Sequence, residues 1–224
     1  MSSMARRARV VIPQLPHHVV HRGNHRQQVF FCDEDRLEYL RILSDSLPKY
    51  GVRIISYCLM KNHVHLITVP QRENSLAGLF RRALMLYSRY VNERHGWIGH
   101  LWQGRYFSSP LDPPYLYNAV RYVERNPVRA GLVEKPWEYR WSSALFRLTA
   151  RRNSNILQRY SPLEDMVTDW RSYLELELPD ITLGRLRRST KAGTPMGSEE
   201  FLQRLEQAGI EFSRGKRGRT PDWM

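Results

Sequence analysis

The chain has 224 residues, enough for one well-packed core with an extension and too few for two full domains. Its 35 lysines and arginines outnumber its 22 aspartates and glutamates, which gives a formal net charge of +13. Such an excess favours a polyanionic partner, because each neutralised phosphate releases counterions. We therefore expect nucleic acid as the partner, with an anionic membrane surface as the weaker alternative and solubility alone as a third reading.

Cysteine usage and the N-terminus indicate the compartment. Cys32 and Cys58 are the only cysteines, and their spacing argues against a disulfide framework and against a cysteine zinc site. The basic N-terminus is followed by only three apolar residues before Pro13, too few for a signal peptide or a membrane span. We expect a cytoplasmic, nucleoid-associated protein with no membrane segment.

Apolar spacing and turn residues predict alternating strands and helices up to residue 126. In chain order they are a strand at 17–22, a helix from Asp33 to about 48–51, strands at 52–60 and 61–70, a helix from Asn74-Ser75 to about Asn92, a strand at 105–108, and a helix at 115–126 that starts after Pro113-Pro114 and is closed by Pro127. The first six of these elements have the order β-α-β-β-α-β, which predicts a ferredoxin-like α+β fold in which helices cover one antiparallel sheet.

The composition changes after about residue 150. We expect residues 1–150 to form the main domain and residues 151–224 to form a looser, basic C-terminal extension, partly helical or disordered. One short helix is predicted near residues 199–205, where Ser198 can cap it. A cluster of basic residues follows in a glycine-containing tail.

The strand at 61–70 carries two histidines. Side chains alternate across a strand, so His63 and His65 share one face while Val64 and Leu66 share the other. Two imidazoles side by side suit a divalent metal, although the same pair can also be a polar face without a site. His21, in the first strand, is interpreted as structural.

Several classes of metalloprotein use a His-x-His pair, and the flanking residues separate them. A metallo-hydrolase of the His-x-His-x-Asp type needs aspartate where this chain has Ile67. A cupin needs a glutamate a few residues on, where Val69 and Pro70 stand. The remaining pattern is histidine, hydrophobe, histidine, typical of nucleases and transposases that cut single-stranded DNA through a tyrosine on a nearby helix.

The helix at 115–126 supplies such a tyrosine. Tyr122 and Asn126 are four residues apart and share a face; Tyr115 lies on roughly the same stripe, and Tyr117 does not. The pattern alone favours core packing for any of these tyrosines.

Four segments, in order, resemble the REP-associated tyrosine transposases, bacterial relatives of the single-tyrosine HUH transposases of insertion sequences. They are Arg-Gly-Asn-His-Arg at 22–26, Tyr-Cys-Leu-Met-Lys-Asn-His-Val-His at 57–65, Leu-Trp-Gln-Gly-Arg-Tyr at 101–106, and Tyr-Val-Glu-Arg-Asn-Pro-Val-Arg-Ala-Gly-Leu-Val at 122–133.

The resemblance implies a ferredoxin-like fold, Mg²⁺ or Mn²⁺ on His63 and His65, Tyr122 as nucleophile and Asn126 as third ligand. Related enzymes of insertion sequences have glutamine at that last position. Asparagine is one methylene shorter, so direct ligation and ligation through a water both stay open.

The implied activity is cleavage and rejoining of single-stranded DNA at hairpin-forming repeats through a 5′-phosphotyrosine. Monomer and homodimer both remain open, as do a replication-initiator or relaxase-type nickase and a DNA-binding protein without catalysis. The basic residues expected to contact DNA are Arg22, Arg105, Arg125, Arg129, Arg214, Lys216, Arg217 and Arg219.

Overall fold

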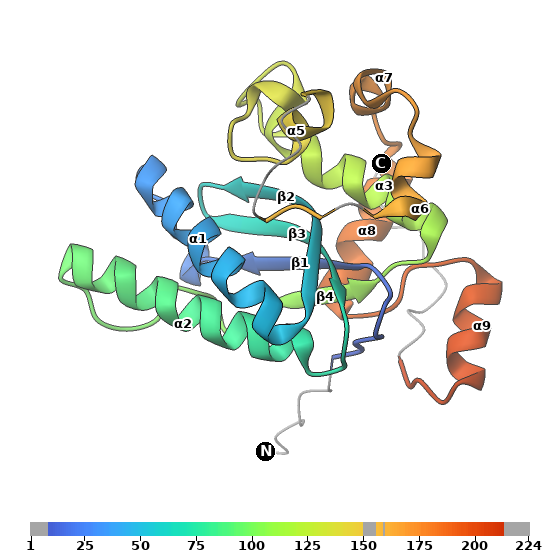
Figure 1. The fold of residues 1–224 in the computed structure, drawn as a ribbon, viewed down its shortest axis with the longest axis horizontal. Coiled ribbons are helices and arrows are strands. Elements are labelled where there is room, and N and C mark those ends of the chain that lie inside the picture. Colours follow the sequence, from blue (N-terminus) through green and yellow to red (C-terminus); the bar gives the residue numbers. More distant parts are fainter. Residues whose placement is uncertain (1–8, 150–155, 159, 213–224) are drawn as a thin grey trace, which may run out of the picture.

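The computed structural model describes residues 9–149, 156–158 and 160–212. Its centre is one sheet of four strands in the order β2-β3-β1-β4, with every neighbouring pair antiparallel (Figure 1). The strands are β1 His17–Arg22, β2 Val52–Met60, β3 His63–Pro70 and β4 Phe107–Pro110. This order confirms the predicted ferredoxin-like α+β fold.

The helices of the described residues are α1 Asp33–Tyr50, α2 Ser75–His95, α3 Pro113–Glu124, α4 Asn126–Arg129, α5 Ala144–Leu148, α6 Ser161–Met166, α7 Trp170–Glu175, α8 Asp180–Ala192 and α9 Glu199–Gln207, with 3-10 turns η1 Asn24–Arg26 and η2 Pro136–Glu138. Helix α1 begins where the buried Asp35 carboxylate accepts the N–H groups of Phe31 and Cys32, at 2.6 and 3.1 Å. Both α1 and α2 end at a left-handed glycine, Gly51 and Gly96.

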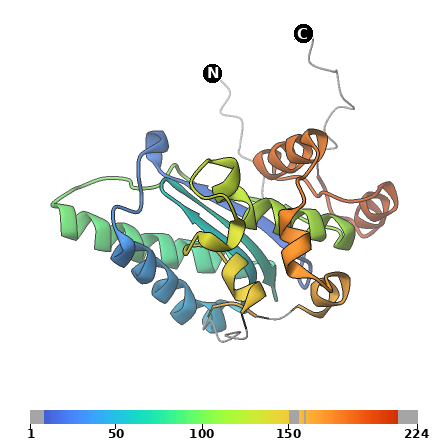
Figure 2. The same cartoon turned by 90° about the horizontal axis from the view of Figure 1, so that it is seen from above.

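The sheet has an apolar core on each face. Helices α1 and α2 cover one face, where Leu66 and Val64 of β3 pack with Leu79 and Tyr87 of α2. Helices α3 and α8 lie on the other face, where Ile67 of β3 belongs to the core that α3 buries. Seen from above, the sheet separates these two sets of helices (Figure 2). Alternate residues of β3 therefore enter different cores, as its sequence predicts.

Several predicted element boundaries differ from the structure by a few residues, and two of these differences lie near the candidate site. Strand β4 begins at Phe107, two residues later than expected, because the chain first turns at Gly104, whose φ is +63°. The helix around Tyr122 does not run on to Asn126 and stop at Pro127: α3 ends at Glu124, and Pro127 occupies the first turn of α4. A proline inside a continuous helix would clash with the carbonyl four residues back, so the helix breaks at Arg125 and restarts.

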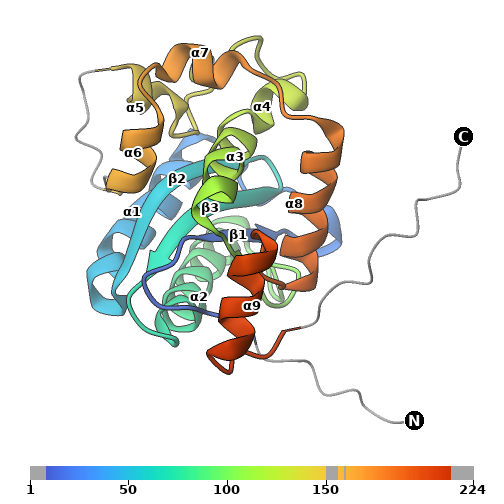
Figure 3. The same cartoon turned by 90° about the vertical axis from the view of Figure 1, so that its right-hand side faces the viewer.

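The described part of the extension is more ordered than predicted. It contains α6 to α9, of which only α9 was expected, and α8 runs beside α3 (Figure 3). Leu183 and Leu186 of α8 are buried in the core that α3 also forms, and Met196 exchanges backbone hydrogen bonds with the segment around Pro110. Helices α6 and α7 have 6 residues each, and α8 has few apolar positions among its 13 residues, so no clear helical period marks them in the sequence. The predicted basic tail, with Arg214, Lys216, Arg217 and Arg219, lies outside the described residues.

No helix among these residues is both long and apolar enough to cross a bilayer.

Candidate active site

The site begins with the register of two strands. β1 pairs antiparallel with β3, which sets Arg22 opposite His63 and Val20 opposite His65. Both histidines face α3, because Val64 between them is buried in the opposite core. The ring centroids of His63 and His65 are 5.0 Å apart. The paired imidazoles expected from the His-x-His spacing are therefore present on one face of the sheet.

Helix α3 brings the tyrosine to this face. Its apolar side, which includes Val120 and Val123, packs against the sheet and leaves Tyr122 over the histidines. The Tyr122 ring stands edge-on to the His65 ring, with centroids 5.5 Å apart. The hydroxyl of Tyr87 donates to a backbone carbonyl, whereas no hydrogen bond to the Tyr122 hydroxyl is found within the described ranges. The fold thus leaves the Tyr122 hydroxyl available to a substrate.

The other tyrosines of α3 lie elsewhere. The hydroxyl of Tyr115 accepts from Arg185 of α8 at 2.7 Å, and Tyr117 packs against Tyr173. Neither lines the cavity beside the histidines.

The predicted catalytic and metal-binding residues line one cavity of about 580 Å³. His63, His65, Tyr122 and Asn126 all line it, together with Arg22 of β1. Further lining comes from η1 and α8, through Arg26, Arg187, Thr190 and Lys191. The walls therefore combine the expected chemical groups with several cations.

Arg129 contacts both the ring and the backbone of Tyr122, the candidate nucleophile. Its guanidinium carbon lies 4.3 Å from the centroid of the Tyr122 ring, and its Nη2 donates to the Tyr122 carbonyl at 3.0 Å and to Asn126 Oδ1 at 2.6 Å. One side chain thus bridges the break between α3 and α4.

Burial favours the neutral form of both imidazoles, which is the form that can ligate a metal. Burial lowers the pKa of His63 to about 4 and the pKa of His65 well below 6.5, with Arg22 adding a repulsive charge in both cases. His63 Nδ1 pairs with Asn62 Oδ1 at 2.7 Å, and His65 Nδ1 pairs with His18 Nε2 at 3.0 Å. No hydrogen bond to either Nε2 is found in the part of the chain that the structure describes, so each Nε2 can bind a metal in the tautomer that leaves it a lone pair.

The donor set fits a divalent metal through two imidazoles. Among the described residues, no group of three or more His, Cys, Asp and Glu side chains could hold an ion. A third protein ligand would have to be the Asn126 amide, whose Oδ1 is directed to Arg129 and whose buried Nδ2 lacks a partner within those residues. Water and phosphate oxygens are the other ligands a mixed nitrogen–oxygen site takes.

Some of the arginines predicted to contact DNA line a cavity, and another is buried. Arg22 lines the cavity, and the exposed Arg105 lines an adjoining hollow with Arg9. Arg125 corrects the prediction: its side chain is buried, and its Nη1 donates to the carbonyls of Leu174 and Glu175 at 2.7 and 2.8 Å. Its guanidinium therefore anchors the end of α7 and is not available to DNA.

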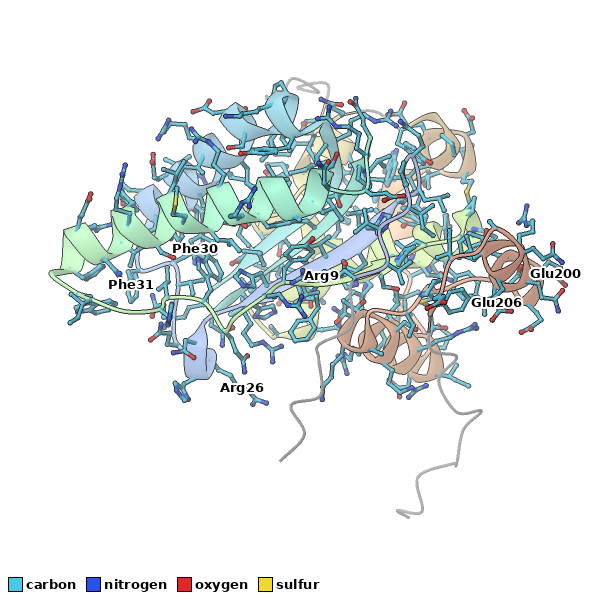
Figure 4. All side chains as sticks on the ribbon, turned by 90° about the horizontal axis from the view of Figure 1, so that it is seen from below. Arg9, Arg26, Phe30, Phe31, Glu200 and Glu206 are labelled. Atoms are coloured by element: carbon cyan, nitrogen blue, oxygen red, sulfur yellow. The ribbon has the colours of Figure 1, made fainter. Side chains whose placement is uncertain are left out.

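The face around the cavity is basic. Arg26 extends from η1 on the lower side of the view in Figure 4, whereas the acidic side chains Glu200 and Glu206 lie on α9 at the right-hand end. This separation leaves the cavity without an acidic rim from α9.

Sequence reasoning missed His18, Arg187, Thr190 and Lys191. His18 lies in a predicted strand, but its contact with His65 depends on how β1 pairs with β3. The three α8 residues belong to an extension without a clear period.

A ferredoxin-like sheet with a His-x-His strand beneath a tyrosine-bearing helix is the architecture of the HUH class of DNA-processing proteins. A family model described as "Transposase IS200 like" matches residues 11–126, more than half of the chain. The chain therefore belongs to the IS200-like transposase family.

Two solved structures are similar. One, described as a REP-associated tyrosine transposase bound to a REP hairpin, has a TM-score of 0.56 and 17% sequence identity, covering 79% of this chain and 100% of that one. At this identity the match shows a shared fold. The other, a candidate transposase from Deinococcus radiodurans R1, has a TM-score of 0.38 and 21% identity, covering 54% of this chain and 97% of that one. No curated protein matches the sequence.

Proposed function

We propose that this IS200-like transposase cuts and rejoins single-stranded DNA at hairpin-forming repeats through a 5′-phosphotyrosine on Tyr122. The observation that carries the proposal is the position of Tyr122, whose ring lies 5.5 Å from that of His65 in a basic cavity that also contains His63. The REP hairpin bound to the solved relative supports the choice of substrate.

The covalent step exchanges one bond for another. The Tyr122 oxygen forms a bond to phosphorus while the bond from phosphorus to the 3′ oxygen breaks. The phenol gives up its proton, the departing 3′ oxygen ends as a hydroxyl, and the protein keeps the 5′-phosphate. Because the bond energy is retained, a different 3′-hydroxyl can reverse the step, which is strand transfer without a nucleoside triphosphate.

The neutral imidazoles of His63 and His65 would hold Mg²⁺ or Mn²⁺. Such an ion would act as a Lewis acid that offsets the negative charge developing at the scissile phosphate. Arg129 fixes the Tyr122 ring over these imidazoles through its contacts to both Tyr122 and Asn126. The chain's own part is thus to bring hydroxyl and phosphate together, which requires reacting atoms about 3–3.5 Å apart.

The cavity rim suits a DNA strand. Arg22, Arg26, Arg187 and Lys191 approach it from three elements, so a phosphate chain can pass the site with a cation on either side. Purely repressive binding would not need the histidine pair beside the tyrosine.

The test is incubation of the purified protein with a single-stranded oligonucleotide that carries a hairpin repeat, in Mg²⁺ or Mn²⁺. We expect a covalent protein–DNA adduct whose peptide map places a 5′-phosphotyrosine on Tyr122, and none with Tyr122→Phe. Tyr115→Phe is the matched control, because its hydroxyl contacts Arg185 outside the cavity. An adduct on any other residue would overturn the assignment.

A further inference from the structure

Three buried polar side chains from three distant segments form a chain that ends at a histidine of the active site. Thr190 Oγ1 lies 2.7 Å from His18 Nδ1, and His18 Nε2 lies 3.0 Å from His65 Nδ1. The exposed fraction is 4% for Thr190, 1% for His18 and 5% for His65. Buried polar groups are costly without partners, so these hydrogen bonds are obligatory parts of the fold.

The two imidazoles meet edge to edge. Their planes differ by only 6°, and their centroids are 5.2 Å apart although the nearest nitrogens are 3.0 Å apart. Parallel rings with this offset share a hydrogen bond in the ring plane, so one nitrogen must donate and the other accept. The bond therefore couples the proton positions of His18 and His65.

Two arrangements of the protons satisfy the chain. In the first, His65 Nδ1–H donates to His18 Nε2, and His18 Nδ1–H donates to the Thr190 hydroxyl oxygen. In the second, every donor and acceptor is reversed, which puts a proton on His65 Nε2. Only the first leaves a lone pair on His65 Nε2, the ring nitrogen that His18 does not occupy.

The charge around the cavity favours the first arrangement. The cavity beside His65 carries the cations Arg22 and Arg187, which attract a lone pair and repel an N–H. The Thr190 hydroxyl oxygen, 2.7 Å from His18 Nδ1, can accept the hydrogen bond that this arrangement requires.

We propose that His18 and Thr190 are positioning residues that hold His65 as its Nδ1–H tautomer, with Nε2 ready to bind a metal. The proposal rests on the function proposed above, since it supposes that His65 is a ligand. It also gives α8 a role in the site, although the family match ends at residue 126. Such partners of metal-binding histidines commonly change metal affinity about 10- to 100-fold.

The first test needs neither metal nor DNA. Long-range ¹H–¹⁵N spectra of the full chain labelled at histidine report which ring nitrogen carries the proton, and the His65 signals are assigned with a His65→Gln variant. We expect the Nδ1–H tautomer for His65 and for His18 in the wild-type protein. A wild-type His65 in the Nε2–H tautomer would overturn the proposal, whatever the variants do.

The second test compares two substitutions at one position. Thr190→Val keeps the shape and removes the acceptor oxygen, whereas Thr190→Ser keeps that oxygen and serves as the matched control. We expect Mn²⁺ affinity, measured by electron paramagnetic resonance on protein without DNA, to fall about 10- to 100-fold in Thr190→Val and little in Thr190→Ser. The His65 spectrum of Thr190→Val should become a mixture of tautomers.

Thr190→Val with wild-type Mn²⁺ affinity would contradict the proposal. If the wild-type protein binds no Mn²⁺, the metal part of the proposed function fails, and the tautomer spectrum still decides on the arrangement of His18 and Thr190. The two failures are therefore distinguishable.

Discussion

The guanidinium of Arg129 packs on the ring of Tyr122, with 4.3 Å between its central carbon and the ring centroid. The same side chain donates to the Tyr122 carbonyl and to Asn126 Oδ1. These interactions occupy an arginine that we predicted from its motif to bind DNA. The geometry favours instead a role in fixing Tyr122 across the break between α3 and α4.

Arg129→Ala should therefore slow cleavage more than it weakens DNA binding. A hydrogen bond from a charged group contributes about 1.5–3 kcal/mol, which corresponds to roughly a 10- to 100-fold lower rate. Arg129→Lys should recover little of this, because an ammonium cannot reproduce the planar fork. Single-turnover adduct formation gives the rate, and hairpin binding in EDTA gives the affinity. Full-rate cleavage by Arg129→Ala, or a loss confined to affinity, would return this residue to the DNA-binding set.

His63→Ala or His65→Ala should abolish adduct formation while largely preserving hairpin affinity, because binding depends on many arginines. EDTA should reproduce both effects in the wild-type protein. The exposed His100 offers a control, since His100→Ala alters the imidazole content without touching the cavity. Undiminished nicking by either of the first two variants would remove the metal assignment.

The parts of the site that the sequence predicted are those that local patterns determine. The alternation around His63 and His65 fixes their common face, and helical spacing places Asn126 one turn from Tyr122 even though the helix breaks between them. The position of His18 depends on the register of β1 against β3, a pairing between distant segments that no local pattern specifies.

Arg125 and the extension illustrate a second limit. The basic motif around Arg125 suggests that it binds DNA. In the fold, however, its side chain is buried and donates hydrogen bonds to two carbonyls at the end of α7. The contribution of α8 depends on how a stretch of short helices folds back onto α3, which is a tertiary effect rather than a property of the stretch itself.

Glu124, which follows Tyr122 and Val123 in α3, should contribute to stability rather than to catalysis. Its buried Oε1 accepts from the Ser143 hydroxyl at 2.6 Å and from Arg147 Nε at 3.2 Å, joining α3 to α5. Glu124→Ala leaves the mostly buried Arg147 without this partner, and breaking a buried pair costs about 3–5 kcal/mol. Urea unfolding should show the decrease in the free energy of unfolding.

Arg147→Ala provides the matched comparison, and the double variant should be destabilised by less than the sum of the two single effects, because both remove the same interaction. A destabilisation below about 1 kcal/mol in Glu124→Ala would mean that the pair is not the support the structure indicates.

The basic tail yields a separate prediction. Deleting residues 213–224 removes Arg214, Lys216, Arg217 and Arg219 and should weaken hairpin binding. The slope of log affinity against log salt should flatten by about 0.7–0.9 for each DNA phosphate that the tail neutralises in the full chain. Cleavage at saturating substrate should survive, because the deletion spares the cavity residues. Unchanged affinity and slope would assign the tail no part in binding.

Helix α8 should bind the DNA strand through cations of its own. Arg187 and Lys191 are exposed and line the cavity, whereas Arg188 is exposed on the same helix and does not line it. Arg187→Ala with Lys191→Ala should reduce the salt slope of single-strand binding by about 1.4, at roughly 0.7 per neutralised phosphate. Arg188→Ala should leave the slope nearly unchanged, because this arginine does not stand beside the site. Titrations of a fluorescent oligonucleotide at several salt concentrations measure the wild-type protein and both variants. If the slope falls by the same amount per removed positive charge in the double variant and in Arg188→Ala, then α8 contributes only its overall charge. The DNA strand would then not pass this wall of the cavity.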